Sequence, residues 1–160
     1  MTLRERIQTD TTGAMRSGDS LRRDTLRMAA NAAYNIEKRE GRTLSDDELV
    51  AVLVREVKMR RESIDAFRAG GREDLVRKEE AEVAILQEYL PVALSAEELT
   101  QLIDEAVAST GASSARDLGK VMAWLAPRTR GRADGKRVSE LVAQRLAASD
   151  LGAHDRSGGH

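Results

Sequence analysis

The sequence contains no cysteine, and its two histidines, His154 and His160, both stand near its end. The missing thiols exclude disulfide bonds, thiolate metal sites and cysteine nucleophiles. The body of the chain also lacks the residue that most often serves as a general base or a metal ligand, so no Ser-His-Asp triad can be assembled there. We therefore expect no catalytic residue, no metal site and no cofactor, and we predict that the isolated chain is not an enzyme.

Long apolar runs and aromatic residues are scarce as well. No segment approaches the ~20 apolar residues of a membrane-spanning helix, and the N-terminus has no hydrophobic signal core. Together with the absence of cysteine, this predicts a cytoplasmic protein with no membrane partner. With one Trp, one Phe and two Tyr, the core must consist of aliphatic residues and Met. This composition favours helices over strands.

Helical periodicity fills most of the sequence and predicts seven helices. Thr2, Ser45 and Ser95 each precede a Glu by three residues, which is the pattern of a capping box at a helix start. We predict an all-α protein, with an N-terminal antiparallel bundle of about four helices and a C-terminal three-helix domain. Pro91 marks the boundary. The predicted domains cover residues 1–91 and 95–149, and residues 150–160 are predicted to form a disordered tail.

The segment from 119 to 138 predicts a helix, a basic turn and a second helix. Pro127 is expected to stop the first helix, and Asp134 to cap the second. We call residues 128–137 the basic turn. Residues 111–148 carry eight basic and three acidic side chains, although the net charge of the whole chain is −1. Such an asymmetry is typical of a surface that binds a polyanion.

The candidate RNA-binding residues lie in or beside this turn. They are Lys120, Trp124, Arg128, Arg130, Arg132, Lys136 and Arg137. The cations would contact phosphates, which position a nucleic acid without reading its bases. Trp124 shares a helical face with Lys120 and Arg128, and could stack on an unpaired base. In the alternative interpretation the arginines are merely solvated, and Trp124 buries half its ring between the two domains.

Two further groups of charges lie in the third and fourth helices. Glu79, Glu80 and Glu82 could do acid–base work, but no converging partner is evident, and this spacing arises on any solvated helix. Glu56 and Arg60 form an i,i+4 pair that we interpret as exposed and worth ~0.2–0.5 kcal/mol. A sharper alternative adds three cations of the third helix to a nucleic-acid surface, namely Arg55, Lys58 and Arg61.

Several segments carry a resemblance to a known family. Residues 119–122, 130–135 and Val138 resemble the tail domain of the B subunit of aspartyl/glutamyl-tRNA amidotransferases. From about 3 to 146 the chain resembles the GatB/YqeY family of YqeY-like proteins. Its other matching segments are 55–63, Phe67, 69–70, 72–75, 79–80, Glu82 and 89–91. The resemblance implies a helical fold and tRNA binding by the tail domain, with ammonia transfer left to other domains of the amidotransferase.

Three functions are compatible with these observations. The leading hypothesis is a non-catalytic module that binds tRNA or another structured RNA by its shape. The second is a protein-interaction adaptor of the translation machinery. The third is an accessory to a carbon–nitrogen ligase that uses glutamine as amido-N-donor. This last hypothesis rests on resemblance alone, because the chain has no residues for glutamine hydrolysis.

Overall fold

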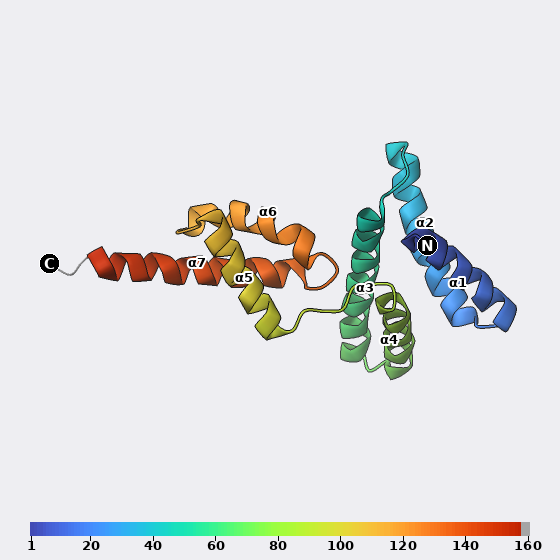
Figure 1. Cartoon of the computed structure of the whole chain (residues 1–160). Helices are drawn as coiled ribbons and strands as arrows, with labels where there is room; N and C mark the ends of the chain where they lie inside the picture. Colours follow the sequence, from blue (N-terminus) through green and yellow to red (C-terminus); the bar gives the residue numbers. More distant parts are fainter. Residues whose placement is uncertain (158–160) are drawn as a thin grey trace. The chain divides into compact units, whose positions relative to one another are not determined.

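A computed structural model describes the backbone of residues 1–157 and the side chains of residues 1–150. Every regular element in this part of the chain is a helix (Figure 1), which confirms the predicted all-α class. The elements are α1 (Leu3–Ser17), α2 (Ser20–Glu40), α3 (Asp46–Ala69), α4 (Glu73–Gln87), α5 (Ala96–Thr110), the short 3₁₀ helix η1 (Ala115–Asp117), α6 (Leu118–Thr129) and α7 (Gly135–Ser157).

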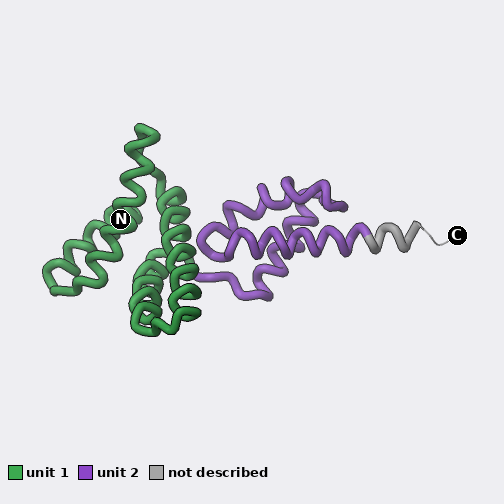
Figure 2. Tube along the Cα trace, turned by 180° about the vertical axis from the view of Figure 1, so that it is seen from behind, with its two compact units in different colours: residues 1–91 green, residues 92–160 purple. Residues whose placement is uncertain are grey.

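The chain divides into two compact units, which Figure 2 distinguishes by colour. Unit 1 is Met1–Pro91 and contains α1 to α4, whereas unit 2 is Val92–His160 and contains α5, η1, α6 and α7. Each unit has hydrophobic clusters of its own. The candidate site at residues 119–138 lies entirely in unit 2.

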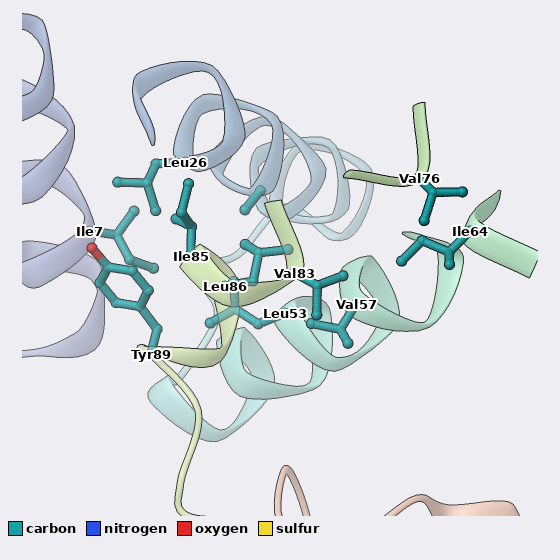
Figure 3. Close-up of a cluster of buried hydrophobic side chains, with 11 residues drawn as sticks. Ile7, Leu26, Leu53, Val57, Ile64, Val76, Val83, Ile85, Leu86 and Tyr89 are labelled. Atoms are coloured by element: carbon teal, nitrogen blue, oxygen red, sulfur yellow. The ribbon is translucent and has the colours of Figure 1, made fainter. Parts of the chain in front are cut away.

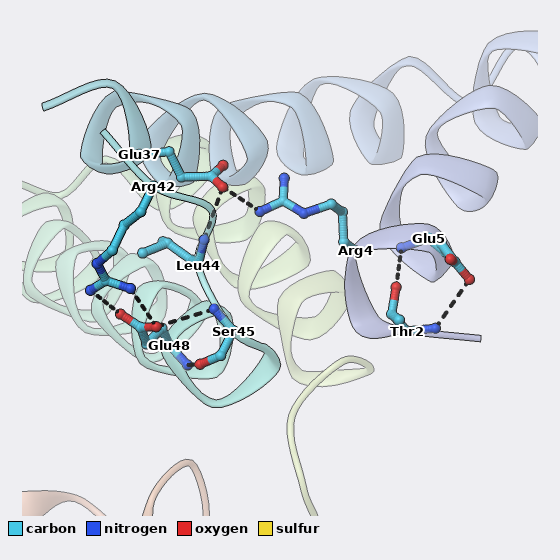
Figure 4. Close-up of polar contacts among 8 residues, drawn as sticks. All are labelled: Thr2, Arg4, Glu5, Glu37, Arg42, Leu44, Ser45 and Glu48. Atoms are coloured by element: carbon cyan, nitrogen blue, oxygen red, sulfur yellow. Dashed lines mark hydrogen bonds and ion pairs between the residues drawn. The ribbon is translucent and has the colours of Figure 1, made fainter. Parts of the chain in front are cut away.

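The helix starts follow local hydrogen-bonding chemistry. The Thr2 hydroxyl accepts from the Glu5 backbone N–H at 3.1 Å, and the Glu5 carboxylate accepts from the Thr2 N–H at 3.2 Å (Figure 4). Ser45 and Glu48 form the same reciprocal pair at the start of α3. Two of the three predicted capping boxes are thus confirmed. At Ser95 the hydroxyl accepts from the Glu98 N–H at 3.1 Å, but Glu98 accepts from the Ser95 hydroxyl instead of from its N–H, so the reciprocal box is not formed. Three helices end in left-handed glycines, at Gly18, Gly41 and Gly111.

Polar contacts fix the loop between α2 and α3 (Figure 4). The Glu37 carboxylate accepts from the Arg4 guanidinium at 2.8 Å and from the Leu44 backbone N–H at 2.9 Å. It thereby joins α1, α2 and the loop. Arg42 donates to both carboxylate oxygens of Glu48, at 2.9 and 2.6 Å, and this contact is the main reason why the pKa of Glu48 is lowered to about 2.

The main apolar core of unit 1 draws on all four of its helices (Figure 3). Leu26 of α2, Leu53 of α3 and Leu86 of α4 are almost completely buried. Tyr89 lies at the edge of this core and donates its hydroxyl proton to the Asp10 carboxylate. Burial and the Asp10 charge raise the pKa of Tyr89 to about 12. Each buried leucine contributes ~1.5–3 kcal/mol, so these side chains dominate the stability of the bundle.

A charged cluster lies inside unit 1, where the sequence predicted an exposed pair. Glu56, Arg60 and Glu82 are only 6%, 5% and 7% exposed. The Arg60 guanidinium donates to the Glu56 carboxylate at 2.7 Å and to the Glu82 carboxylate at 3.0 Å. The exposed interpretation of this pair was wrong because α4 packs against α3 and brings Glu82 across to Arg60. Helical spacing within α3 contains no information about that neighbour.

The core of unit 2 consists of apolar residues that recur at helical spacing. Val121 and Leu125 of α6 and Val138, Val142 and Leu146 of α7 are completely buried. They pack with Leu99, Ile103 and Ala106 of α5 in one cluster. Their i, i+4 and i+8 spacing places each stripe on a single face of its helix. The two helices that flank the basic turn are therefore anchored on their inner faces.

Two features of unit 2 differ from the prediction. Pro127 does not stop α6, which continues to Thr129. A proline in the last turn removes only one N–H from the helix, while Leu125 and Thr129 hold the turn against the core. The predicted tail also begins too early, because the backbone of α7 continues to Ser157. The remaining residues of that tail, 158–160, lie outside the described part of the chain.

Candidate nucleic-acid interface in unit 2

The turn between α6 and α7, drawn as a loop in Figure 1, is defined by hydrogen bonds. Thr129 is buried, and its hydroxyl donates to the Leu125 carbonyl at 3.1 Å. The Thr129 carbonyl in turn accepts from the backbone N–H groups of Arg132 and Ala133, at 2.9 and 3.0 Å. Gly131 allows this geometry because its φ is +75°, in the left-handed region that disfavours other residues. The basic side chains therefore project from a defined loop.

Asp134 caps α7, as predicted. Its carboxylate accepts from the Lys136 backbone N–H at 3.3 Å, and its carbonyl accepts from Val138 N–H at 2.9 Å. The capping carboxylate thus occupies part of the helix N-terminus where an anion would otherwise bind. The side-chain cations, rather than the helix end, must provide the anion-binding capacity of this region.

Arg128 lies over the ring of Trp124. Its guanidinium carbon is 3.6 Å from the ring centroid, and the same guanidinium donates to the Trp124 carbonyl. Trp124 is half-buried and packs against the core of unit 2, whereas Arg128 is exposed. The structure thus brings together two predicted site residues that are one helical turn apart.

Arg132 makes different contacts from the other arginines of the turn. Its Nε donates to the Val92 carbonyl at 3.0 Å, and a terminal nitrogen lies 3.9 Å from the Glu98 carboxylate. The Arg132 carbonyl also accepts from the Leu94 N–H at 2.8 Å. Arg132 therefore ties the segment before α5 to the turn. Sequence reasoning missed this role because the residues lie about 40 positions apart and share no pattern.

The remaining candidate cations are exposed, and they are Lys120, Arg130, Lys136 and Arg137. Lys120 lies 3.8 Å from Asp117, and Arg137 lies 4.0 Å from Glu140, both at the outer limit of an ion pair. Arg130 and Lys136 form no ion pair with the side chains of residues 1–150. Farther along α7, Arg145 pairs with Asp104 of the acidic helix α5 at 3.1 Å. Positive charge in unit 2 is thus less compensated at Arg130 and Lys136 of the basic turn than at Arg145.

Two of these cations lie at positions where a positive charge lowers the free energy of unfolding. Lys136 and Arg137 lie in the first turn of α7, which contains no acidic residue. The helix dipole presents partial positive charge at that end, so each cation opposes it by ~0.3–1 kcal/mol. Selection for folding alone would favour Asp or Glu in this turn. The placement is explained if the positive charge serves to bind an anion.

The carboxylates of α4 do not form a second site. Burial raises the pKa of Glu79, the Glu82 charge adds to this effect, and Arg60 opposes it. However, Glu82 is paired with Arg60, and Glu80 is exposed and pairs with Arg68 at 3.0 Å. Among the described residues, no group of His, Asp and Glu side chains is arranged to hold a metal ion. No helix in that part of the chain has the length and apolar character to cross a membrane.

Comparison with known proteins places this geometry in a family. A family model described as Yqey-like protein matches residues 4–146. The chain belongs to the YqeY-like family. The match confirms the family predicted from the sequence, and it covers α6, the basic turn and most of α7. The candidate interface of the YqeY-like chain is therefore part of the family domain.

Three similar proteins share the name "Altered inheritance of mitochondria protein 41, mitochondrial". The protein from Pyrenophora tritici-repentis is 30% identical over 147 residues, which are 89% of this YqeY-like chain and 80% of that protein. The Lachancea thermotolerans protein is 28% identical over 88% of this chain and 79% of its own length. The Eremothecium gossypii protein is 38% identical over 61% of this chain and 55% of its own length.

The names of these relatives correct one prediction. All three are described as mitochondrial proteins. This finding overturns the cytoplasmic location that we predicted for the YqeY-like chain. The prediction relied on missing cysteines and a missing signal core, and neither feature distinguishes the cytosol from a mitochondrial compartment. The same names state no ligand and no reaction.

Proposed function

We propose that this YqeY-like chain is a non-catalytic RNA-binding module. The basic turn would contact the phosphates of a structured RNA, with tRNA as the class that the resemblance to the amidotransferase tail domain favours. One observation carries the proposal: exposed, weakly compensated cations gather on a turn whose backbone is fixed by Thr129 and Gly131. Two of these cations also oppose the dipole of α7.

The chemistry of the surface favours recognition of shape over recognition of sequence. Lysine and arginine bind phosphates wherever the backbone of the RNA presents them, and they carry no base information in doing so. The candidate contacts are Lys120, Arg128, Arg130, Lys136 and Arg137. About three to five phosphate contacts give log affinity a slope of roughly −2 to −4 against log salt, since ~0.7–0.9 counterions are released per phosphate.

A salt titration with matched variants tests the proposal. Binding of tRNA to the full chain is measured at several salt concentrations for the parent and for Arg130→Ala/Lys136→Ala/Arg137→Ala. We expect weaker binding and a slope flattened by about 0.7–0.9 for each lost contact. The matched control is Arg16→Ala/Arg77→Ala/Lys78→Ala, which removes the same charge from exposed positions of unit 1 that belong to no candidate surface. It should bind like the parent.

Arg132 is excluded from the test because its substitution would disturb the contacts to Val92 and Leu94. Lys136 and Arg137 are suitable because their removal relieves an unfavourable dipole interaction, so the variant should be at least as stable as the parent. Equal losses in the two triple variants would mean that the basic turn is not the site. If the parent binds no RNA at all, the adaptor hypothesis takes precedence.

A further inference from the structure

The stacked pair of Trp124 and Arg128 has a property that phosphate binding does not require. A cation that serves only as a point charge needs no aromatic support, and a flexible lysine would suffice. Here the guanidinium carbon lies 3.6 Å above the indole centroid, within the range of a cation–π contact. We propose that this pair is a stacking platform for an unpaired base, so that the RNA bound by unit 2 carries a single-stranded nucleotide. This inference rests on the proposed function and specifies its ligand.

The lower layer of the platform is rigid. Trp124 packs against the core of unit 2, and Val121 and Leu125 on the same helix are completely buried. The contacts of the ring with this core restrict its rotamers before a ligand arrives. A rigid ring has little conformational entropy left to lose on binding.

The upper layer is held as well. Arg128 donates to the Trp124 carbonyl as well as lying over its ring. This contact lies in the last turn of α6. Two contacts thus hold an arginine that would otherwise sample many rotamers and would lose that freedom when a ligand ordered it. Because this side chain is already ordered, little rotamer entropy is left to lose when a ligand binds.

One face of this guanidinium lies on Trp124, and the exposed side chain remains accessible to a ligand. Proteins bind splayed-out RNA bases by stacking them on aromatic rings and on arginine planes. A base on Arg128 would complete a three-layer stack above the indole. Lys120 lies one helical turn before Trp124, and Arg130 lies two residues after Arg128. Both are exposed and could hold the phosphates that flank the stacked nucleotide.

A paired base is not a ligand for such a platform. Within a duplex each base is already stacked on both faces, and A-form RNA presents its backbone and a shallow groove instead. The pair therefore distinguishes RNA with a free nucleotide from RNA that is fully paired. The cations of the turn alone would bind both forms, because both present phosphates.

The test compares a blunt RNA duplex with the same duplex carrying a short single-stranded adenosine overhang. We expect the full chain to bind the overhang duplex at least about 5-fold more tightly, which is the lower end for one stacked base. Trp124 is the only tryptophan in the sequence, so its fluorescence reports directly on the platform. Its emission should be quenched by the overhang duplex and change little with the blunt one.

Arg128→Lys keeps the charge but removes the planar group. We expect the ratio of the two affinities to fall toward one in this variant, while circular dichroism confirms that the fold is retained. Arg77→Lys, a matched change at an exposed arginine of α4, should leave the ratio unchanged.

Equal affinity of the parent for the two duplexes would overturn the stacking inference and leave the proposed function intact. A preference that survives in Arg128→Lys would also overturn it. If neither duplex binds, both the inference and the proposed function fail.

Discussion

Among individual residues, Arg60 has the most demanding environment. It lies between two buried carboxylates, Glu56 and Glu82, and donates a hydrogen bond to each. A terminal nitrogen also lies 3.7 Å from the Met28 sulfur. Because charges are costly to bury, such a cluster is tolerable only while every member has its partner. Among the described residues, every buried side-chain nitrogen and oxygen has a hydrogen-bond partner.

Substituting Arg60 should therefore damage unit 1 severely. Arg60→Met leaves two buried carboxylates facing each other, and we expect a loss of ~3–5 kcal/mol in the free energy of unfolding. Urea denaturation followed by circular dichroism measures this loss. Arg61→Met is the matched control, since Arg61 is an exposed arginine on the same helix. Similar stabilities for the two variants would show that the cluster contributes no more than a surface pair.

At the scale of elements, the contacts of Arg132 determine how α5 begins. The side chain holds the Val92 carbonyl and the backbone holds the Leu94 N–H, just before the cap at Ser95. These bonds connect the start of α5 to the loop between α6 and α7. They fix a segment that has no secondary structure of its own.

Removing the Arg132 side chain should free this segment. In Arg132→Ala, we expect faster cleavage by a nonspecific protease around residues 92–95, where Val92 is already 83% exposed. Limited proteolysis with mass spectrometry identifies the cut. Arg130→Ala, which removes an exposed arginine from the same loop, should be cleaved like the parent. An unchanged cleavage rate in Arg132→Ala would show that the backbone bond at Leu94 is sufficient.

The sequence predicted elements better than it predicted contacts between them. Capping at Thr2 and Ser45 depends on residues three positions apart, so a local sequence pattern is sufficient to predict it. The continuation of α6 past Pro127 depends on tertiary packing, which outweighs the local preference of proline. The pairing of Arg60 with Glu82 and the contacts of Arg132 join distant parts of the chain. Without knowledge of which helices are neighbours, no spacing rule could find them.

At the scale of the whole molecule, unit 1 and unit 2 have separate cores. Trp124 lies in unit 2, and both tyrosines lie in unit 1. Tryptophan fluorescence therefore reports on unit 2 alone, whereas circular dichroism at helical wavelengths reports on both units. The chain thus contains its own probe for comparing the stabilities of its two parts.

We expect the two units to unfold in separate transitions. Thermal unfolding followed by tryptophan fluorescence should give one midpoint, and circular dichroism should show a second transition. Arg60→Met should lower the transition of unit 1 and leave the fluorescence midpoint unchanged, because the substituted residue belongs to the other core. A single transition that shifts in both signals would indicate that the units unfold as one cooperative body.

The contacts of Arg132 also define the first residue of unit 2 that must be kept when this unit is transferred to another gene. Secondary structure alone would place its first residue at the cap Ser95. Arg132 donates to the Val92 carbonyl and accepts from the Leu94 N–H, and these two bonds move that limit upstream to the residue after Pro91. A gene fusion or natural recombination event that joins this module to another protein would preserve it only if the crossover falls at or before Val92.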